Sequence, residues 1–148
     1  MNINRRKWLG SMLALGSAAL LPMRLFADTA AAFKATSADV ALKELFGDLP
    51  MEESAAIKFK VPDIAENGAV VPVSVSTDID GVQSITIMVD ENPNPLSASF
   101  NISADAVADI STRVKMGKSS KVRALVRTPD KVYFASQEVK VTIGGCGG

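Results

Sequence analysis

The sequence carries one thiol, and it lies close to the C-terminus. Cys146 is the only cysteine among 148 residues, and it is the centre of the pentapeptide GGCGG that ends the chain. No histidine is present, which excludes imidazole metal ligands and histidine general bases. The thiol of a free cysteine has a pKa of about 8.5, and the terminal carboxylate close by disfavours the thiolate further. Such a thiol is typical of a group presented to other enzymes rather than of a self-sufficient catalyst.

Glycines surround this thiol on both sides. They are Gly144, Gly145, Gly147 and Gly148. Glycine adopts both signs of φ without steric cost, so residues 144–148 are predicted to form a slim, flexible arm. Fully extended, such an arm spans about 17 Å at roughly 3.3 to 3.6 Å per residue. Cys146 is therefore the candidate for covalent attachment of a substrate that enters a narrow channel in another protein.

Other interpretations of this C-terminus are weaker. Prenylation requires a cysteine fourth from the end, whereas Cys146 is third. A terminal Gly-Gly is also found in ubiquitin-like sulfur carriers, but those are cytoplasmic and their mixture of sheet and helix does not fit this sequence. An incidental cysteine in a frayed tail is the remaining alternative.

The N-terminus has the pattern of an export signal. Arg5 and Arg6 lie in NRRKWLG, which resembles the twin-arginine signature, and an apolar run follows. Its 14 residues rise only about 21 Å as a helix, short of the roughly 30 Å hydrocarbon core, so no membrane anchor is expected. We expect residues 1–32 to be the signal, with cleavage between Ala27 and Ala32, and periplasmic delivery in the folded state. The alternative is a basic amphipathic helix of a cytoplasmic protein.

The composition of the chain limits the classes of partner and ligand that we expect it to bind. Loss of residues 1–27 removes four basic residues and no acidic one, which makes the mature chain net acidic. Nucleic acid is therefore not an expected partner. Phosphate-binding loops, paired-carboxylate motifs and Ser/His/Asp sets are missing, so we expect no metal and no cofactor. A single cysteine in an oxidising compartment cannot pair internally, so it is free, modified or bonded to another molecule.

One short helix and a series of strands are expected in residues 33–143. The helix has Thr36 or Ser37 as its N-cap and Gly47 as its stop. After Pro50 the apolar period changes to two, and turn signals separate eight segments. These segments are AAIKFKV, GAVVPVSVS, VQSITIMVD, LSASFNIS, DISTRVKM, KVRALVRT, KVYFAS and EVKVTI. The pattern predicts an all-β, immunoglobulin-like antiparallel β-sandwich whose last strand ends at Ile143.

Alternation also assigns faces. In LSASFNIS it places four side chains together on the buried face: Leu96, Ala98, Phe100 and Ile102. Four basic residues lie opposite the buried face of strands that we expect to be adjacent: Arg113, Lys115, Arg123 and Arg127. They make either a solvated surface or a surface that meets a partner.

Several motifs together resemble the SoxY family, the sulfur-carrier subunits of the periplasmic thiosulfate-oxidising Sox system. They are the terminal VKVTI and GGCGG, VPDIAENGAVVPVSV (61–75), ENPNPL (91–96), TRVKMGKSS (112–120) and the twin-arginine leader. The resemblance implies an immunoglobulin-like sandwich paired with a SoxZ-like β-sandwich subunit as a heterodimer or larger assembly. It also implies a swinging arm of four glycines on which Cys146 bears the sulfur substrate.

The same resemblance implies transient partners and a role. A haem enzyme (SoxAX) couples thiosulfate to the thiol, a hydrolase (SoxB) releases sulfate, and in some systems a molybdenum-dependent dehydrogenase (SoxCD) oxidises the remaining sulfane sulfur. We therefore expect a non-enzymatic covalent sulfur carrier without a metal site. The alternative is an exported β-sandwich adaptor whose thiol forms a regulatory disulfide with a partner.

Overall fold

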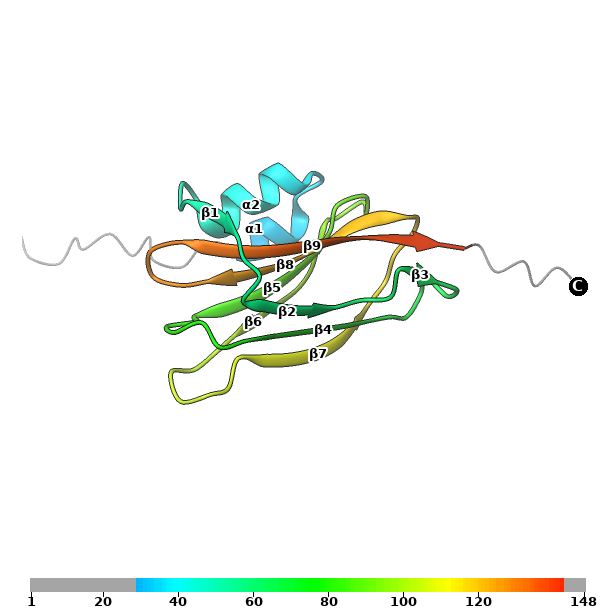
Figure 1. The fold of residues 1–148 in the computed structure, drawn as a ribbon. Helices are drawn as coiled ribbons and strands as arrows, with labels where there is room; N and C mark the ends of the chain where they lie inside the picture. The colour runs from blue at the N-terminus through cyan, green and yellow to red at the C-terminus, as the bar shows by residue number, and fades with distance from the viewer. Residues whose placement is uncertain (1–28, 143–148) are drawn as a thin grey trace, which may run out of the picture.

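The computed structural model describes residues 29–142 (Figure 1). The predictions for the export signal, including Arg5 and Arg6, and for Cys146 with its four glycines fall outside this range. The helices are α1 (Thr29–Lys34) and α2 (Ala38–Phe46). The strands are β1 (Met51–Glu53), β2 (Ile57–Lys60), β3 (Ile64–Ala65), β4 (Val71–Thr77), β5 (Ser84–Val89), β6 (Leu96–Asn101), β7 (Asp109–Val114), β8 (Ser120–Arg127) and β9 (Val132–Val141).

The strands form two sheets that pack face to face (Figure 1). The larger sheet has the order β1-β9-β8-β5-β6, with β3 also pairing with β9, and the smaller has the order β2-β4-β7. Buried side chains of both sheets, such as Val73, Val75, Ile87 and Val126, make the core between them. The two helices cover the outer face of the larger sheet, where a second core forms. The predicted all-β immunoglobulin-like sandwich is confirmed.

The predicted helix is α2, and both of its ends follow from local chemistry. The Ser37 hydroxyl accepts the Val40 N–H at 3.4 Å, which caps the first turn. Gly47 adopts a φ of 60°, and its N–H donates to the Lys43 carbonyl at 2.8 Å. Glycine reaches this positive φ without a Cβ clash, so the helix stops there.

Two predicted strands, KVYFAS and EVKVTI, are a single strand in the structure. β9 runs for ten residues and pairs with β8 in one continuous register from Val132 to Val139. Gln137 lies where the division was expected, and its amide Nε2 donates to the Val61 carbonyl at 3.2 Å. A polar residue at this point therefore contacts a neighbouring loop rather than interrupting the strand. β9 ends at Val141, before the expected end at Ile143, which lies outside the described residues.

The face predicted for Leu96 is wrong because β6 carries a β-bulge. Ile87 of β5 pairs with Ala98, but Met88 pairs with Leu96, which leaves Ser97 as the additional residue. An extra residue reverses the alternation, so Leu96 packs into the helix-side core with Met88. Phe100 and Ile102 pack against the core between the sheets, as expected.

The expected adjacency of the basic strands is also wrong. Arg113 lies on β7, which pairs with β4 in the smaller sheet, whereas Arg123 and Arg127 lie on β8 in the larger one. The chain crosses from β6 to the opposite sheet and returns to β8, so strands consecutive in sequence are not neighbours in space. The four basic residues do not form one surface.

Two short strands that the sequence did not predict line the outer edge of β9. β1 pairs with its start, from Val132 to Phe134, and β3 pairs with its end, at Lys140 and Val141, both in parallel. Between them the chain leaves this sheet to form β2 in the smaller one. The outer edge of β9 is thus supported at both of its ends.

Candidate functional site

The end of β9 is the structural base of the predicted arm. Thr142 is the last described residue, and Cys146 follows four positions later in the sequence. β9 reaches the end of the sandwich beside β3 (Figure 1). We define this region, the arm end, as residues 61–70, 90–95, 115–120 and 140–142.

Backbone N–H groups at the end of β9 are held from both sides. The Val141 N–H donates to Oγ of Ser119 at 2.9 Å, on the side of β8. On the opposite side, the Thr142 N–H donates to the Ala65 carbonyl at 3.1 Å, and the Lys140 N–H donates to the Asp63 carbonyl at 2.9 Å. β9 continues past the position opposite Ser120, the first residue of β8. The Ser119 hydroxyl therefore takes the place of a backbone partner for Val141. The last three described residues are therefore fixed to two different segments.

Gly68 packs tightly against the same end of the strand. Its carbonyl accepts the Met116 N–H at 2.6 Å. A Cβ at position 68 would lie 2.4 Å from the Met116 carbonyl oxygen and 2.9 Å from Cγ1 of Val141. Only glycine fits here without displacing the loop, Met116 or the final strand. Packing therefore requires a glycine at position 68.

The turns of the arm end are tied to one another. The Asn92 amide donates from Nδ2 to the Lys115 carbonyl at 2.7 Å and accepts the Gly117 N–H at 3.2 Å. The Glu91 N–H donates to Oγ of Ser120 at 3.0 Å. The motifs ENPNPL and TRVKMGKSS, which are separate in the sequence, are thus in direct contact. Nothing in their local pattern indicates this pairing, because the partners are more than twenty residues apart.

An exposed ion pair joins the same two turns. Nζ of Lys118 lies 2.8 Å from Oε2 of Glu91. This hydrogen bond, together with the positive charge of the lysine, lowers the pKa of Glu91 below its ordinary value of 4.5. The two turns are therefore joined both by neutral hydrogen bonds and by an ion pair.

Among residues 29–142, no group of three or more Asp, Glu, His or Cys side chains is arranged to hold a metal ion. The half-buried pair of Arg123 and Asp90, joined at 2.6 Å, links β8 to the first residue of the turn that follows β5. No helix in this range is long and apolar enough to cross a membrane.

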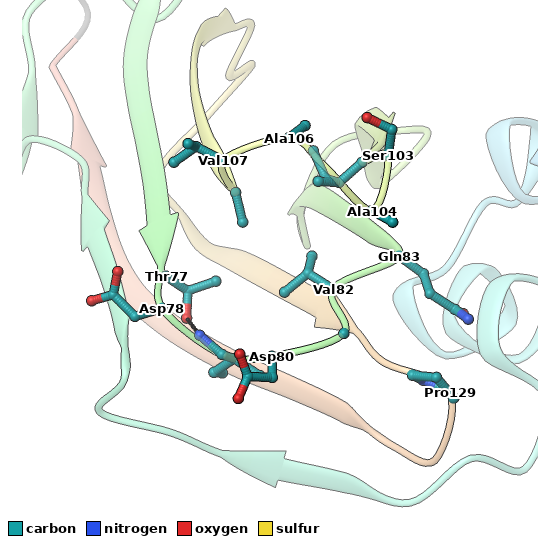
Figure 2. A pocket seen from close by; sticks show the side chains of 14 residues that line it. Thr77, Asp78, Asp80, Val82, Gln83, Ser103, Ala104, Ala106, Val107 and Pro129 are labelled. Atoms are coloured by element: carbon teal, nitrogen blue, oxygen red, sulfur yellow. Dashed lines mark hydrogen bonds between the residues drawn. The ribbon is translucent and has the colours of Figure 1, made fainter.

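A cleft of about 500 Å³ lies at the opposite end of the sandwich (Figure 2). It lies among the loops that follow β4, β6 and β8, and Val82, Val107 and Pro129 supply apolar parts of its wall. Asp78 and Asp80 also line it, and Asp78 is paired with Lys58 at 3.1 Å. Because β9 runs from the loop beside this cleft toward the arm end, the cleft is separate from the base of the arm.

Comparison with known families identifies the chain. The profile of the family described as sulfur oxidation protein SoxY matches residues 42–146, most of the chain and the segment up to the candidate thiol. The chain belongs to the SoxY family. This SoxY match begins within α2 and includes every strand of both sheets.

Solved structures agree with this family. The chain is 44% identical to the sulfur carrier protein SoxY from Chlorobium limicola f thiosulfatophilum. The match covers 71% of this chain and 96% of that one, with a TM-score of 0.65. No curated protein matches.

Two weaker structural matches carry no argument. One is a chain from a structure concerning T cell specificity and activation by toxic shock syndrome toxin-1, at 11% identity, covering 57% of this chain and 99% of that one, with a TM-score of 0.40. The other is the BSP domain of a biofilm associated protein, at 14% identity, covering 68% of this chain and 17% of that one, with a TM-score of 0.39.

Proposed function

We propose that this chain is a covalent sulfur carrier in thiosulfate oxidation and that Cys146 bears the sulfur intermediate. The observation that carries the proposal is SoxY-family membership in a chain whose only cysteine lies four residues beyond a doubly held strand end. Four extended residues reach about 13 Å from Thr142. That distance separates the thiol from the sandwich far enough to enter another protein.

The attachment step is an oxidation that needs an external electron acceptor. The Cys146 thiol and thiosulfate form an S–S bond, giving the S-thiosulfonate, and release one proton and two electrons. A SoxAX-type haem enzyme is the proposed acceptor of those electrons. Water, delivered by a SoxB-type hydrolase, then cleaves the bond between the sulfane and sulfonate sulfurs, releasing sulfate with its proton and leaving a persulfide on Cys146.

The chain itself performs neither step in this proposal. Gly144, Gly145, Gly147 and Gly148 form the arm, and the sandwich supplies its base. A SoxCD-type dehydrogenase is the further proposed partner for oxidation of the persulfide. A SoxZ-like subunit is the permanent partner, and the carrier holds no cofactor besides its bound sulfur.

Location follows from the leader. Arg5 and Arg6 support export through the twin-arginine pathway, which moves folded proteins. The site of action proposed here is therefore the periplasm, where the thiosulfate-oxidising partners would meet the arm.

Intact mass of the chain isolated from thiosulfate-grown cells tests the proposal. We expect sulfur adducts on Cys146 that a thiol reductant removes. A chain that stays unmodified at Cys146 during active thiosulfate oxidation contradicts it.

The variant Cys146→Ser separates a carrier from an adaptor. A carrier loses all thiosulfate turnover, whereas an adaptor retains its noncovalent partner and its turnover and loses only a crosslink. Ser74→Ala, which changes one exposed hydroxyl on the smaller sheet, is the matched control.

A further inference from the structure

The end of β9 extends beyond the start of its neighbour β8. β8 begins at Ser120, opposite Val139, so Val141 has no β8 residue across from it in the register. Its N–H is instead accepted by the Ser119 side chain at 2.9 Å. The next N–H along the chain, that of Thr142, points to the other side and meets the Ala65 carbonyl at 3.1 Å.

We propose that Ser119 is a positioning residue that fixes the starting point of the arm. Ser119 Oγ and the Ala65 carbonyl together form an arm clamp, which holds two consecutive N–H groups from opposite sides. This inference rests on the proposed function, because it assigns the clamp a part in delivery of Cys146. It concerns a residue away from the thiol, with no sulfur chemistry of its own.

The location of Ser119 supports this role over general stabilisation of the fold. The Ser119 hydrogen bond is exposed, whereas the adjacent Ser120 is buried and serves the β5–β6 turn through the Glu91 N–H. The two serines thus have different roles: Ser120 joins two turns, and Ser119 holds Val141 at the end of β9. Loss of the Ser119 hydroxyl removes a contact at the edge of the fold and leaves the core intact.

The consequence of clamp loss is a longer and less directed tether. With the clamp formed, Cys146 lies four positions beyond the last anchor, Thr142. If the end frays back by about two residues, the effective concentration of the thiol at a docked enzyme site falls roughly with the −3/2 power of tether length, about twofold. The Cys146 thiol itself is unchanged in such a variant.

Amide hydrogen exchange of Ser119→Ala in the mature chain with its partner subunit tests the clamp. We expect Val141 and Thr142 to exchange about 3- to 10-fold faster, as loss of one modest hydrogen bond implies, with Val139 unchanged. Ser119→Thr keeps the hydroxyl and should restore slow exchange, and Ser74→Ala should leave both amides unaffected. Unchanged exchange at Thr142 in Ser119→Ala overturns the clamp.

Delivery is measured separately as thiosulfate turnover with the partner enzymes. Ser119→Ala should raise the KM for the carrier about twofold at unchanged kcat, while a small disulfide reagent labels Cys146 at the parent rate. Faster exchange with an unchanged KM overturns the positioning role. If Cys146→Ser retains full turnover, the proposed carrier function fails, and the exchange result alone decides whether the clamp exists.

Discussion

The Asn94 amide donates to the carbonyl of Ala35 at 3.2 Å, which ties the β5–β6 turn to the segment that follows α1. α1 itself packs into the helix-side core, where Ala32 is fully buried. Residues from Thr29 onward therefore belong to the folded unit.

This packing predicts where the export signal is removed. Cleavage after Ala32 would cut α1 in two, whereas cleavage after Ala27 would leave it whole. We expect the mature N-terminus at Asp28, which intact mass of the exported chain determines. A mature chain that begins at Phe33 contradicts this expectation.

Removing residues 28–32 from the mature chain should lower its free energy of unfolding by about 1–2 kcal/mol, since buried apolar contacts are lost.

Leu125 tests the second core. It is fully buried between the larger sheet and the helices. We expect Leu125→Ala to lower the free energy of unfolding by about 2–5 kcal/mol, the sum of lost burial and a residual cavity. Val107→Ala is the control, because Val107 is 82% exposed and its truncation should change stability by less than about 0.5 kcal/mol. Urea unfolding of both variants measures the difference, and similar losses would contradict the burial of Leu125.

Elements specified by local chemistry could be predicted from the sequence. Ser37 and Gly47 mark the ends of α2 because a hydroxyl caps a helix and a glycine tolerates positive φ. Elements that depend on distant pairing could not be predicted in this way. β1 and β3 are too short to show alternation, and they form because β9 offers them an open edge. The bulge at Ser97 reverses the face of Leu96 through pairing with β5, which the sequence of β6 does not show.

The candidate site likewise has a part that local sequence predicts and a part that depends on contacts between distant segments. Cys146 stands out in the sequence because it is a lone thiol among glycines. The contacts that hold the base of the arm join segments far apart in the chain, such as Ser119 with Val141 and Asn92 with Lys115. Their residue types are ordinary for turns, so only the fold reveals that they converge.

Two glycines of the arm end, Gly68 and Gly117, differ in the space around them, so Gly117 serves as the control position for Gly68. A Cβ on Gly68 would collide with the Met116 carbonyl oxygen and with Val141, whereas one on Gly117 would meet nothing within 4 Å. We expect Gly68→Ala to lower the free energy of unfolding by about 1–3 kcal/mol through overpacking. Gly117→Ala should be neutral or stabilising by up to about 1 kcal/mol. Thermal unfolding compares them, and equal effects would contradict the packing described for Gly68.

Arg123 and Asp90 form a half-buried pair whose two members should be strongly coupled. Oδ2 of Asp90 accepts from Nε at 3.0 Å and from Nη2 at 2.6 Å, while Oδ1 is buried without a hydrogen-bond partner. We expect Arg123→Met to cost about 1.5–3 kcal/mol, because it leaves a carboxylate largely buried and unpaired. The double variant with Asp90→Asn should recover part of this loss. A double-mutant cycle measures the coupling, and additive effects would show that the pair is independent.

Glu91 gives the arm end a dependence on acid pH. The hydrogen bond from Lys118, and then its positive charge, lower the pKa of Glu91 below 4.5. A carboxylate with a lowered folded-state pKa stabilises the fold above its ordinary pKa, and that contribution disappears as the pH falls through the lowered value. The link between the two turns should therefore persist at neutral pH and open only in acid below pH 4.5.

An NMR titration of the Glu91 side-chain carboxyl measures this directly. We expect a midpoint below 4.5 in the parent chain, and a return toward 4.5 in Lys118→Met, which keeps the length of the stem and removes the charge. High salt should shift the parent midpoint in the same direction, because exposed charges are screened. If Lys118→Met leaves the midpoint where it is in the parent, the lysine is not its cause. The hydrogen bonds of Asn92, and that of the Glu91 N–H with Ser120, do not involve the Glu91 carboxyl and connect these turns in either case.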